Sequence, residues 1–183
     1  DHRDLHSFPT RRSSDLFSGA NALTLLLYGA LSGMLFLLPF DLIERRGLSA
    51  TQVGLTLLPF GAIVGTLSRP AGDWADREGP RQPLLIGSLL LAAAAALMAL
   101  GIRSYWTGVL VPVLLMSLAM AAVAAPLTTA VMNAAPTSQS GAASGVNNAV
   151  SRLAGLLAVA ALGALASAGF GGTLEAGRGQ AAP

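Results

Sequence analysis

Two short groups of polar residues stand out in a sequence that is otherwise dominated by apolar side chains. The first group is the segment GDWADREGPR, which contains Gly72, Asp76, Arg77, Gly79 and Arg81. Asp76 can accept hydrogen bonds from unpaired N–H groups at a helix N-terminus, where the helix dipole favours an anion. Arg77 and Arg81 can pair with acids on a neighbouring helix end. Gly72 and Gly79 permit tight turns and close approach of helix ends. These residue types predict electrostatic contacts between neighbouring helices.

The second group is a polar stripe formed by Gly141, Gly145, Asn148 and Arg152, whose spacings of four, three and four place them on one helix face. If the membrane begins near the start of this helix, Arg152 lies about 15 Å deep. At that depth Arg152 and Asn148 are expected to line a substrate or proton pathway. Alternatively, the charge-free run Leu153–Leu174 is itself long enough to span, and it would place Arg152 at the membrane interface.

The rest of the composition excludes most catalytic chemistry. Beyond residue 16 the chain contains no His, it has no Cys at all, and every basic side chain is Arg. A zinc site, a thiol nucleophile and a histidine base therefore cannot be built. The net charge is only +2, which does not predict a nucleic-acid surface. We expect no enzyme activity, no metal, no cofactor and no nucleic-acid partner.

Hydrophobicity sets the fold class. The chain is 53% hydrophobic and 11% charged, whereas about a quarter of residues are charged in soluble domains. A helix needs about twenty apolar residues to cross a bilayer, and the apolar runs are continuous, which disfavours a transmembrane barrel. The sequence therefore predicts an all-α polytopic membrane protein with antiparallel neighbouring helices. Five spans are expected: Ala20–Ile43, Thr51–Ser68, Pro83–Ile102, Trp106–Met132 and one within Ala142–Ala168.

Small residues suggest how these spans pack. Three glycine pairs have the GxxxG spacing, which lets helix backbones approach closely in lipid. They are Gly29 with Gly33, Gly61 with Gly65, and Gly141 with Gly145. We expect them to pack helices within the chain, in preference to forming a dimer seam.

The GDWADREGPR segment resembles the loop signature of the major facilitator superfamily, G-x-L-a-D-r-x-G-r-r, which lies between the second and third helices of a six-helix half. The matching residues are Gly72, Ala75, Asp76, Arg77, Gly79 and Arg81. Trp74 replaces the usual Leu, and Pro80 replaces a basic residue. In this family the loop is cytoplasmic and is understood to latch one conformation of the alternating-access cycle. The resemblance therefore implies a conformational latch.

Two other stretches are similar to the C-terminal half of the fourteen-helix drug:proton antiporters. They are LFLLPFDLIERRGLSATQVGLTLLPFG and SGAASGVNNAVSRLAGLLAVAALG. The resemblance implies that residues 17–170 are five transmembrane helices of an incomplete six-helix half, which lacks its last helix and the N-terminal half. Residues 171–183 are expected to be a Gly/Ala-rich tail or loop.

The same resemblance implies a function. The chain is expected to be a fragment of a secondary active transporter in the inner (plasma) membrane of a bacterium. Its partners would be the lipid bilayer, a small amphipathic or cationic compound that is exported, and the proton that drives export by alternating access. The alternative is a non-transporting membrane scaffold or assembly subunit with the same helices.

The opening segment DHRDLHSFPTRRSSDL differs from everything that follows. It lacks the apolar core of a secretory signal, and its acids are unlike a transit peptide. Residue by residue it resembles the translation of a short-read sequencing adapter. We therefore expect residues 1–16 to be an adapter-derived artefact, not native sequence, and exclude them from the predicted bundle.

Overall fold

The structure is a computed structural model that describes residues 7–135 and 139–180, with side chains described in 15–135, 139–165 and at Ser167. The described chain contains five long helices. They are α1 (Ser7–Phe40), α2 (Ala50–Glu78), α3 (Arg81–Ala99), α4 (Val111–Asn133) and α5 (Ser140–Gln180). A π-helical turn, η1 (Asp41–Arg45), extends α1, and another, η2 (Trp106–Leu110), leads into α4. Each of the five helical segments is long and apolar enough to cross a membrane, which confirms the all-α polytopic class.

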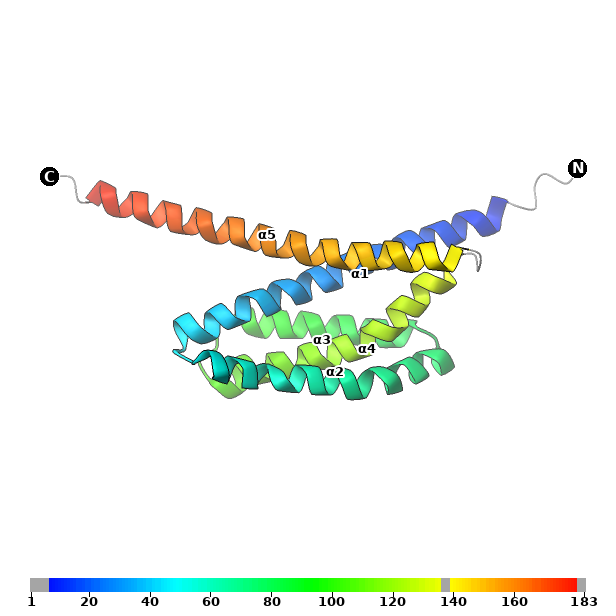
Figure 1. Cartoon of the computed structure of the whole chain (residues 1–183), viewed down its shortest axis with the longest axis horizontal. Coiled ribbons are helices and arrows are strands. Elements are labelled where there is room, and N and C mark those ends of the chain that lie inside the picture. The colour runs from blue at the N-terminus through cyan, green and yellow to red at the C-terminus, as the bar shows by residue number, and fades with distance from the viewer. Residues whose placement is uncertain (1–6, 136–138, 181–183) are drawn as a thin grey trace, which may run out of the picture.

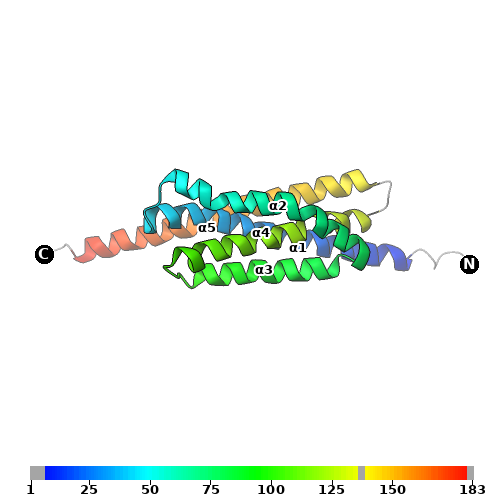
Figure 2. The same ribbon diagram turned by 90° about the horizontal axis from the view of Figure 1, so that it is seen from below.

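The helices form two groups around α4. Helices α2 and α3 both pack along α4, whereas α5 packs mainly along α1 and crosses above the other three (Figures 1 and 2). Half of the most apolar stretch of α4 is buried, compared with 6% of that in α5. Helix α4 is therefore the centre of the bundle, and the outer helices expose apolar faces, as expected of segments that contact lipid or further protein.

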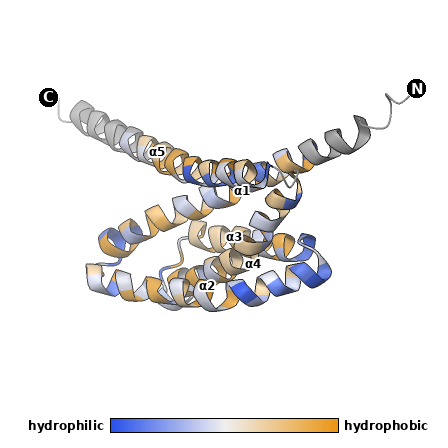
Figure 3. Cartoon of the chain, turned by 45° about the vertical axis from the view of Figure 1, so that its right-hand side comes forward, coloured by the Kyte–Doolittle hydropathy of each residue, from blue (hydrophilic) through white to orange (hydrophobic). Residues whose placement is uncertain are grey.

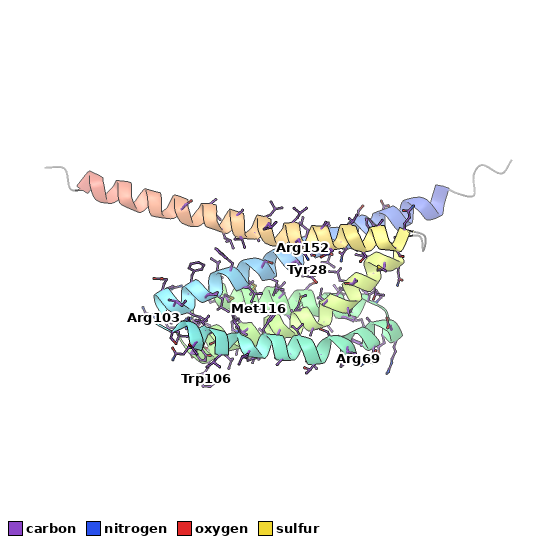
Figure 4. All side chains as sticks on the ribbon, viewed as in Figure 1. Tyr28, Arg69, Arg103, Trp106, Met116 and Arg152 are labelled. Atoms are coloured by element: carbon purple, nitrogen blue, oxygen red, sulfur yellow. The ribbon has the colours of Figure 1, made fainter. Side chains whose placement is uncertain are left out.

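Two groups of buried apolar side chains hold the bundle together. A central group joins α1, α3 and α4, and Met116 marks its position in Figure 4. A second group lies at the end where α1 meets α2 and α3 meets η2. The central group is Leu31, Met34, Leu91, Ala94, Met116 and Ala119. The second is Leu38, Leu42, Val53, Val109 and Val113.

Local sequence signals explain how α2 begins. Ser49 precedes the helix, and its hydroxyl accepts a hydrogen bond from the Gln52 backbone N–H at 3.3 Å. The Gln52 side chain accepts in return from the Ser49 backbone N–H at 2.8 Å, which completes a capping box. Gly47, with φ +69°, supplies the left-handed residue that ends the preceding turn. Together these residues reverse the chain between α1 and α2.

Helix α2 is longer than predicted. It continues past Ser68 to Glu78, so the expected loop Arg69–Gln82 is mostly helix, and only Gly79 and Pro80 separate α2 from α3. The charges, Gly and Pro of this stretch indicated a loop. Beyond the apolar layer, however, a helix keeps its internal hydrogen bonds in water. The bond from Trp74 Nε1 to Glu78 Oε2, at 2.9 Å, adds an i,i+4 contact.

The two ends of the chain also differ from the expected boundaries. The backbone of Ser7–Leu16 continues α1, although the first helix was expected to begin at Ala20. Helix α5 continues to Gln180, through most of the segment expected to be a tail or loop. Residues 1–6 and 181–183 lie outside the described residues. The adapter origin of residues 1–16 remains a prediction.

Only one GxxxG pair packs as expected. A Cβ added at Gly33 would lie 3.0 Å from Leu162 Cδ1, and one added at Gly29 would lie 3.7 Å from the Ala154 carbonyl oxygen, so α1 approaches α5 closely here. In the other two pairs, an added Cβ meets no described atom within 4 Å. The expectation of packing within the chain is therefore wrong for α2 and for the beginning of α5, whose neighbours approach along other faces.

Candidate functional site

The predicted latch segment is the last two turns of α2 and the turn into α3. Ala75 is buried, and a Cβ added at Gly72 would lie 3.4 Å from the Ala125 Cβ in α4. Gly72 is helical and faces α4, where the added Cβ would make only an ordinary contact. The tight turn predicted at Gly72 is wrong, because the helix does not end there, and the spacing to α4 does not require a glycine.

Gly79 makes the turn. Its φ of +90° and ψ of 158° lie in a region that is essentially restricted to glycine. Its N–H donates to the Ala75 carbonyl at 2.8 Å, which closes the last turn of α2. Pro80 follows at once and α3 begins at Arg81. The expected tight turn at Gly79 is confirmed.

The charged residues of this segment point outward. Asp76, Arg77 and Arg81 are all exposed, and no hydrogen bond or ion pair joins their side chains to other described residues. The first turn of α3 receives no side-chain cap. The predicted contact of Asp76 with a helix N-terminus is therefore not formed within the described chain. Asp76 lies near the C-terminus of α2, where the helix dipole disfavours an acid.

The predicted pathway stripe lies on the outer face of α5. Asn148 and Arg152 are exposed, and Arg152 Nε donates to Asn148 Oδ1 at 3.3 Å. A neighbouring face of α5 packs on α1, where Thr24 Oγ1 donates to Asn147 Oδ1 at 2.9 Å and Thr24 is fully buried. The candidate span Ser140–Leu165 includes Arg152. Asn148 and Arg152 therefore take no part in the contact between α5 and α1, to which Asn147 contributes.

Sequence reasoning missed the best-satisfied polar cluster. At the end of α1, Arg46 Nε donates to Asp41 Oδ2 at 2.8 Å. The two terminal nitrogens of Arg46 donate to the backbone carbonyls of Arg103, at 2.8 Å, and Ile102, at 2.9 Å. A cavity of about 520 Å³ opens beside this cluster and is also lined by Tyr105. The two carbonyl acceptors are more than fifty residues away from Arg46 in sequence, and a backbone carbonyl leaves no sequence signal.

The two charged clusters occupy opposite ends of the bundle. Arg103 and Trp106 mark one end in Figure 4, and Arg69 marks the other. Hydrophilic positions gather at these ends and along the first part of α5, with apolar helix between them (Figure 3). No group of three or more His, Asp or Glu side chains that could hold a metal lies within the described residues. The arrangement is that of a polytopic helical membrane protein.

Comparison with known proteins gives the family. The family model of the Major Facilitator Superfamily matches residues 4–159. The chain belongs to this superfamily, which confirms the resemblance carried by the α2–α3 segment.

Several proteins named for drug resistance or export are similar to this chain. The chain is 32% identical to the multidrug resistance protein Stp of Mycobacterium tuberculosis over 81% of its length and 28% of the relative's. It is 29% identical to the tetracenomycin C resistance and export protein of Streptomyces glaucescens over 87% of its length and 30% of the relative's. It is 32% identical to the lincomycin resistance protein of Streptomyces lincolnensis over 77% of its length and 30% of the relative's. The chain thus spans less than a third of each, and no solved structure matches.

Proposed function

We propose that this chain is part of a secondary active transporter that exports a small amphipathic or cationic compound. The observation that carries the proposal is the similarity to three proteins named for drug resistance or export, over 77–87% of the chain. Export would be coupled to a proton gradient by alternating access, in the inner membrane of a bacterium. The five apolar helical segments and the exposed apolar faces of α2 and α5 support residence in a bilayer.

Within the parent protein, the chain would supply five of the six helices of the C-terminal half. Substrate sites in transporters built from two halves lie near the bilayer midplane at the interface of the halves. Two of the three GxxxG faces are open in this chain, and small residues on a lipid-embedded helix favour close helix packing. We propose that the remainder of the parent packs against these faces.

The latch role of Gly72, Asp76, Arg77, Gly79 and Arg81 follows from what the segment leaves unsatisfied. An acid in the last turn of α2 is locally unfavourable by about 0.3–1 kcal/mol, so Asp76 does not serve the stability of its own helix. Its side chain is exposed and finds no ion-pair partner in the described part of the chain. We propose that Asp76 accepts N–H bonds from a helix N-terminus in the rest of the parent, in one conformation only.

Asn148 and Arg152 are proposed to line the transport pathway. An Arg at the centre of a membrane helix costs roughly 2.5–3.5 kcal/mol on insertion scales and is retained where it faces water or a polar partner. Arg152 is on the face of α5 that does not pack on α1, and it holds Asn148 through one hydrogen bond. That face would border the pathway between the two halves.

The test is an efflux measurement on the full-length gene. It would be expressed in a bacterial host that lacks its own major efflux pumps, and accumulation of ethidium, a fluorescent amphipathic cation, would be recorded. We expect lower accumulation than in cells with an empty vector, and loss of the difference when a protonophore collapses the gradient. Unchanged accumulation of a panel of amphipathic compounds, with the protein abundant in the membrane, would favour the scaffold alternative.

A further inference from the structure

The end of the bundle where α1 meets α2 is held by one side chain that reaches three partners. Arg46 follows η1, and its guanidinium donates to the Asp41 carboxylate and to the carbonyls of Ile102 and Arg103. Asp41 and Arg46 both belong to the α1–α2 connection (residues 41–49). Both carbonyls belong to the α3–η2 connection (residues 100–105). A single planar group therefore bridges two separate helix connections.

The neighbouring arginine shows that this arrangement is specific. Arg45 also pairs with Asp41, at 3.1 Å, but its side chain is 71% exposed, whereas that of Arg46 is 17% exposed. Arg45 donates to no described carbonyl of the α3–η2 connection. The two residues have the same charge and adjacent positions, and only Arg46 crosses between connections.

The backbone of the α3–η2 connection is shaped to receive Arg46. Gly101, with φ +61°, ends α3 and turns the chain, which leaves the following carbonyls without helical partners. A Cβ added at Gly108 would lie 2.1 Å from the Ile102 carbonyl oxygen. Glycine at position 108 thus lets that carbonyl keep the place in which it accepts from Arg46.

A second polar contact reinforces the same junction. The hydroxyls of Thr56 in α2 and Tyr105 just before η2 lie 2.9 Å apart, and Thr56 is 3% exposed. The buried group that includes Leu42, Val53 and Val109 fills the space between the two connections. Polar and apolar contacts beside the two connections therefore join the first turns of α2 to the segment that leads into α4.

We propose that Arg46 is a positioning residue that joins the α1–α2 connection to the α3–η2 connection, so that this end of the bundle moves as one rigid unit. Asp41 orients the guanidinium, and the two carbonyls receive it. A Lys at this position offers a point charge on a flexible stem and does not reproduce the planar donor set. The joint does not depend on the proposed transport activity.

The experiment measures distance distributions between spin labels in the full-length protein. This chain contains no Cys, so labels can be placed at Ala50→Cys, the exposed first residue of α2, and at Ser104→Cys, an exposed residue between α3 and η2. A reference pair, Asp73→Cys and Asn133→Cys, reports on the opposite end. Any cysteines in the remainder of the parent would first be replaced.

We expect a narrow distribution for the Ala50–Ser104 pair in the otherwise unchanged protein. In Arg46→Gln and Arg46→Lys it should become about twofold broader, because neither side chain can hold the carboxylate and both carbonyls together. Arg45→Gln, the matched control, should leave it narrow. The reference pair should be unchanged in all variants.

Two results would overturn the proposal that Arg46 joins the two connections. An equally narrow Ala50–Ser104 distribution in Arg46→Gln would show that the connections hold together without the guanidinium. Broadening of both label pairs in Arg46→Gln would show that Arg46 supports the stability of the whole bundle and does not position these two connections.

Discussion

Acids and arginines lie close together in sequence at both ends of this bundle, and the two ends use them differently. Asp41 forms ion pairs with both Arg45 and Arg46, and Arg46 also donates to two backbone carbonyls. At the opposite end, Asp76 and Arg77 are exposed and form no ion pair with described residues. The same side-chain chemistry is thus satisfied locally at one end and left available at the other.

The difference comes from the backbone that each end offers. Between α3 and η2 the chain has several non-helical residues, so carbonyls such as that of Ile102 are free to accept from a guanidinium. Between α2 and α3 only Gly79 and Pro80 are non-helical, and the Pro80 carbonyl already accepts from the Leu84 N–H at 3.1 Å. The short turn therefore offers few free carbonyl groups, and the charged side chains of Asp76 and Arg77 remain available to other partners.

Gly108→Ala should have the largest effect on stability, because it disturbs the end of the bundle where Arg46 binds the Ile102 carbonyl. The new methyl group would overlap the Ile102 carbonyl oxygen, 2.1 Å away, and this backbone atom can move only with the connection. We expect a loss of about 3 kcal/mol in unfolding free energy, at the upper part of the range for overpacking. Thermal unfolding of the full-length protein in detergent measures it. Gly54→Ala, with no described atom within 4 Å, is the control, and an equal loss there would contradict the steric reason.

Asp76→Asn tests whether the charge of Asp76, at the α2–α3 end of the bundle, is needed for transport. The substitution keeps the size and removes the charge, and charge-assisted hydrogen bonds contribute about 1.5–3 kcal/mol. Transport by the full-length protein should therefore fall roughly tenfold or more. Membrane abundance should hold, since the helix dipole disfavours an acid at this place.

The control for Asp76 is its neighbour on the same helix. Asp73→Asn removes an equally exposed charge that the family signature does not include, and its effect on transport should be mild. Near-normal, equal rates for the two variants, normalised to abundance, would reduce the segment to a solvated turn and remove the functional contrast between the ends.

Gly79→Ala should have an intermediate effect on stability. At φ +90° and ψ 158° an Ala is strained, and we expect a loss of about 1–2 kcal/mol in unfolding free energy. Gly72→Ala lies in regular helix with its Cβ at 3.4 Å from Ala125, an ordinary contact, and it should be close to neutral. Thermal unfolding of both variants compares the two glycines of the same segment, and a larger loss in Gly72→Ala than in Gly79→Ala would contradict the strained turn at Gly79.

Thr24→Val should have the smallest effect. Its hydrogen bond with Asn147 is the neutral side-chain link between α1 and α5, and such bonds within membranes average about 0.6 kcal/mol. A double-mutant cycle with Asn147→Ala should return a coupling of this size. Thr128→Val, whose hydroxyl bonds only to its own helix at Ala124, should show no coupling with Asn147→Ala, and a coupling there would mean that the cycle reports general loosening.

Much of the membrane architecture was predictable because hydropathy is a local property. The five spans, the antiparallel order and the Gly79 turn were all expected from composition and spacing. The end of α2 was not predicted, because Gly, Pro and charges indicate a loop wherever they occur. Only the folded chain shows that α2 continues through Asp73–Glu78. Packing of the GxxxG pairs was also beyond prediction, since the spacing says nothing about which partner approaches.

By itself, the sequence determined that this protein is a helical membrane protein. Continuous apolar runs can be buried in lipid only as helices whose backbones are internally hydrogen-bonded. It also determined which polar residues were conspicuous. Only the tertiary structure decided which of them are satisfied. Asp41 and Arg46 meet the carbonyls of Ile102 and Arg103, and a backbone carbonyl is the same in every residue. A partner of that kind becomes visible only once the chain has folded back on itself.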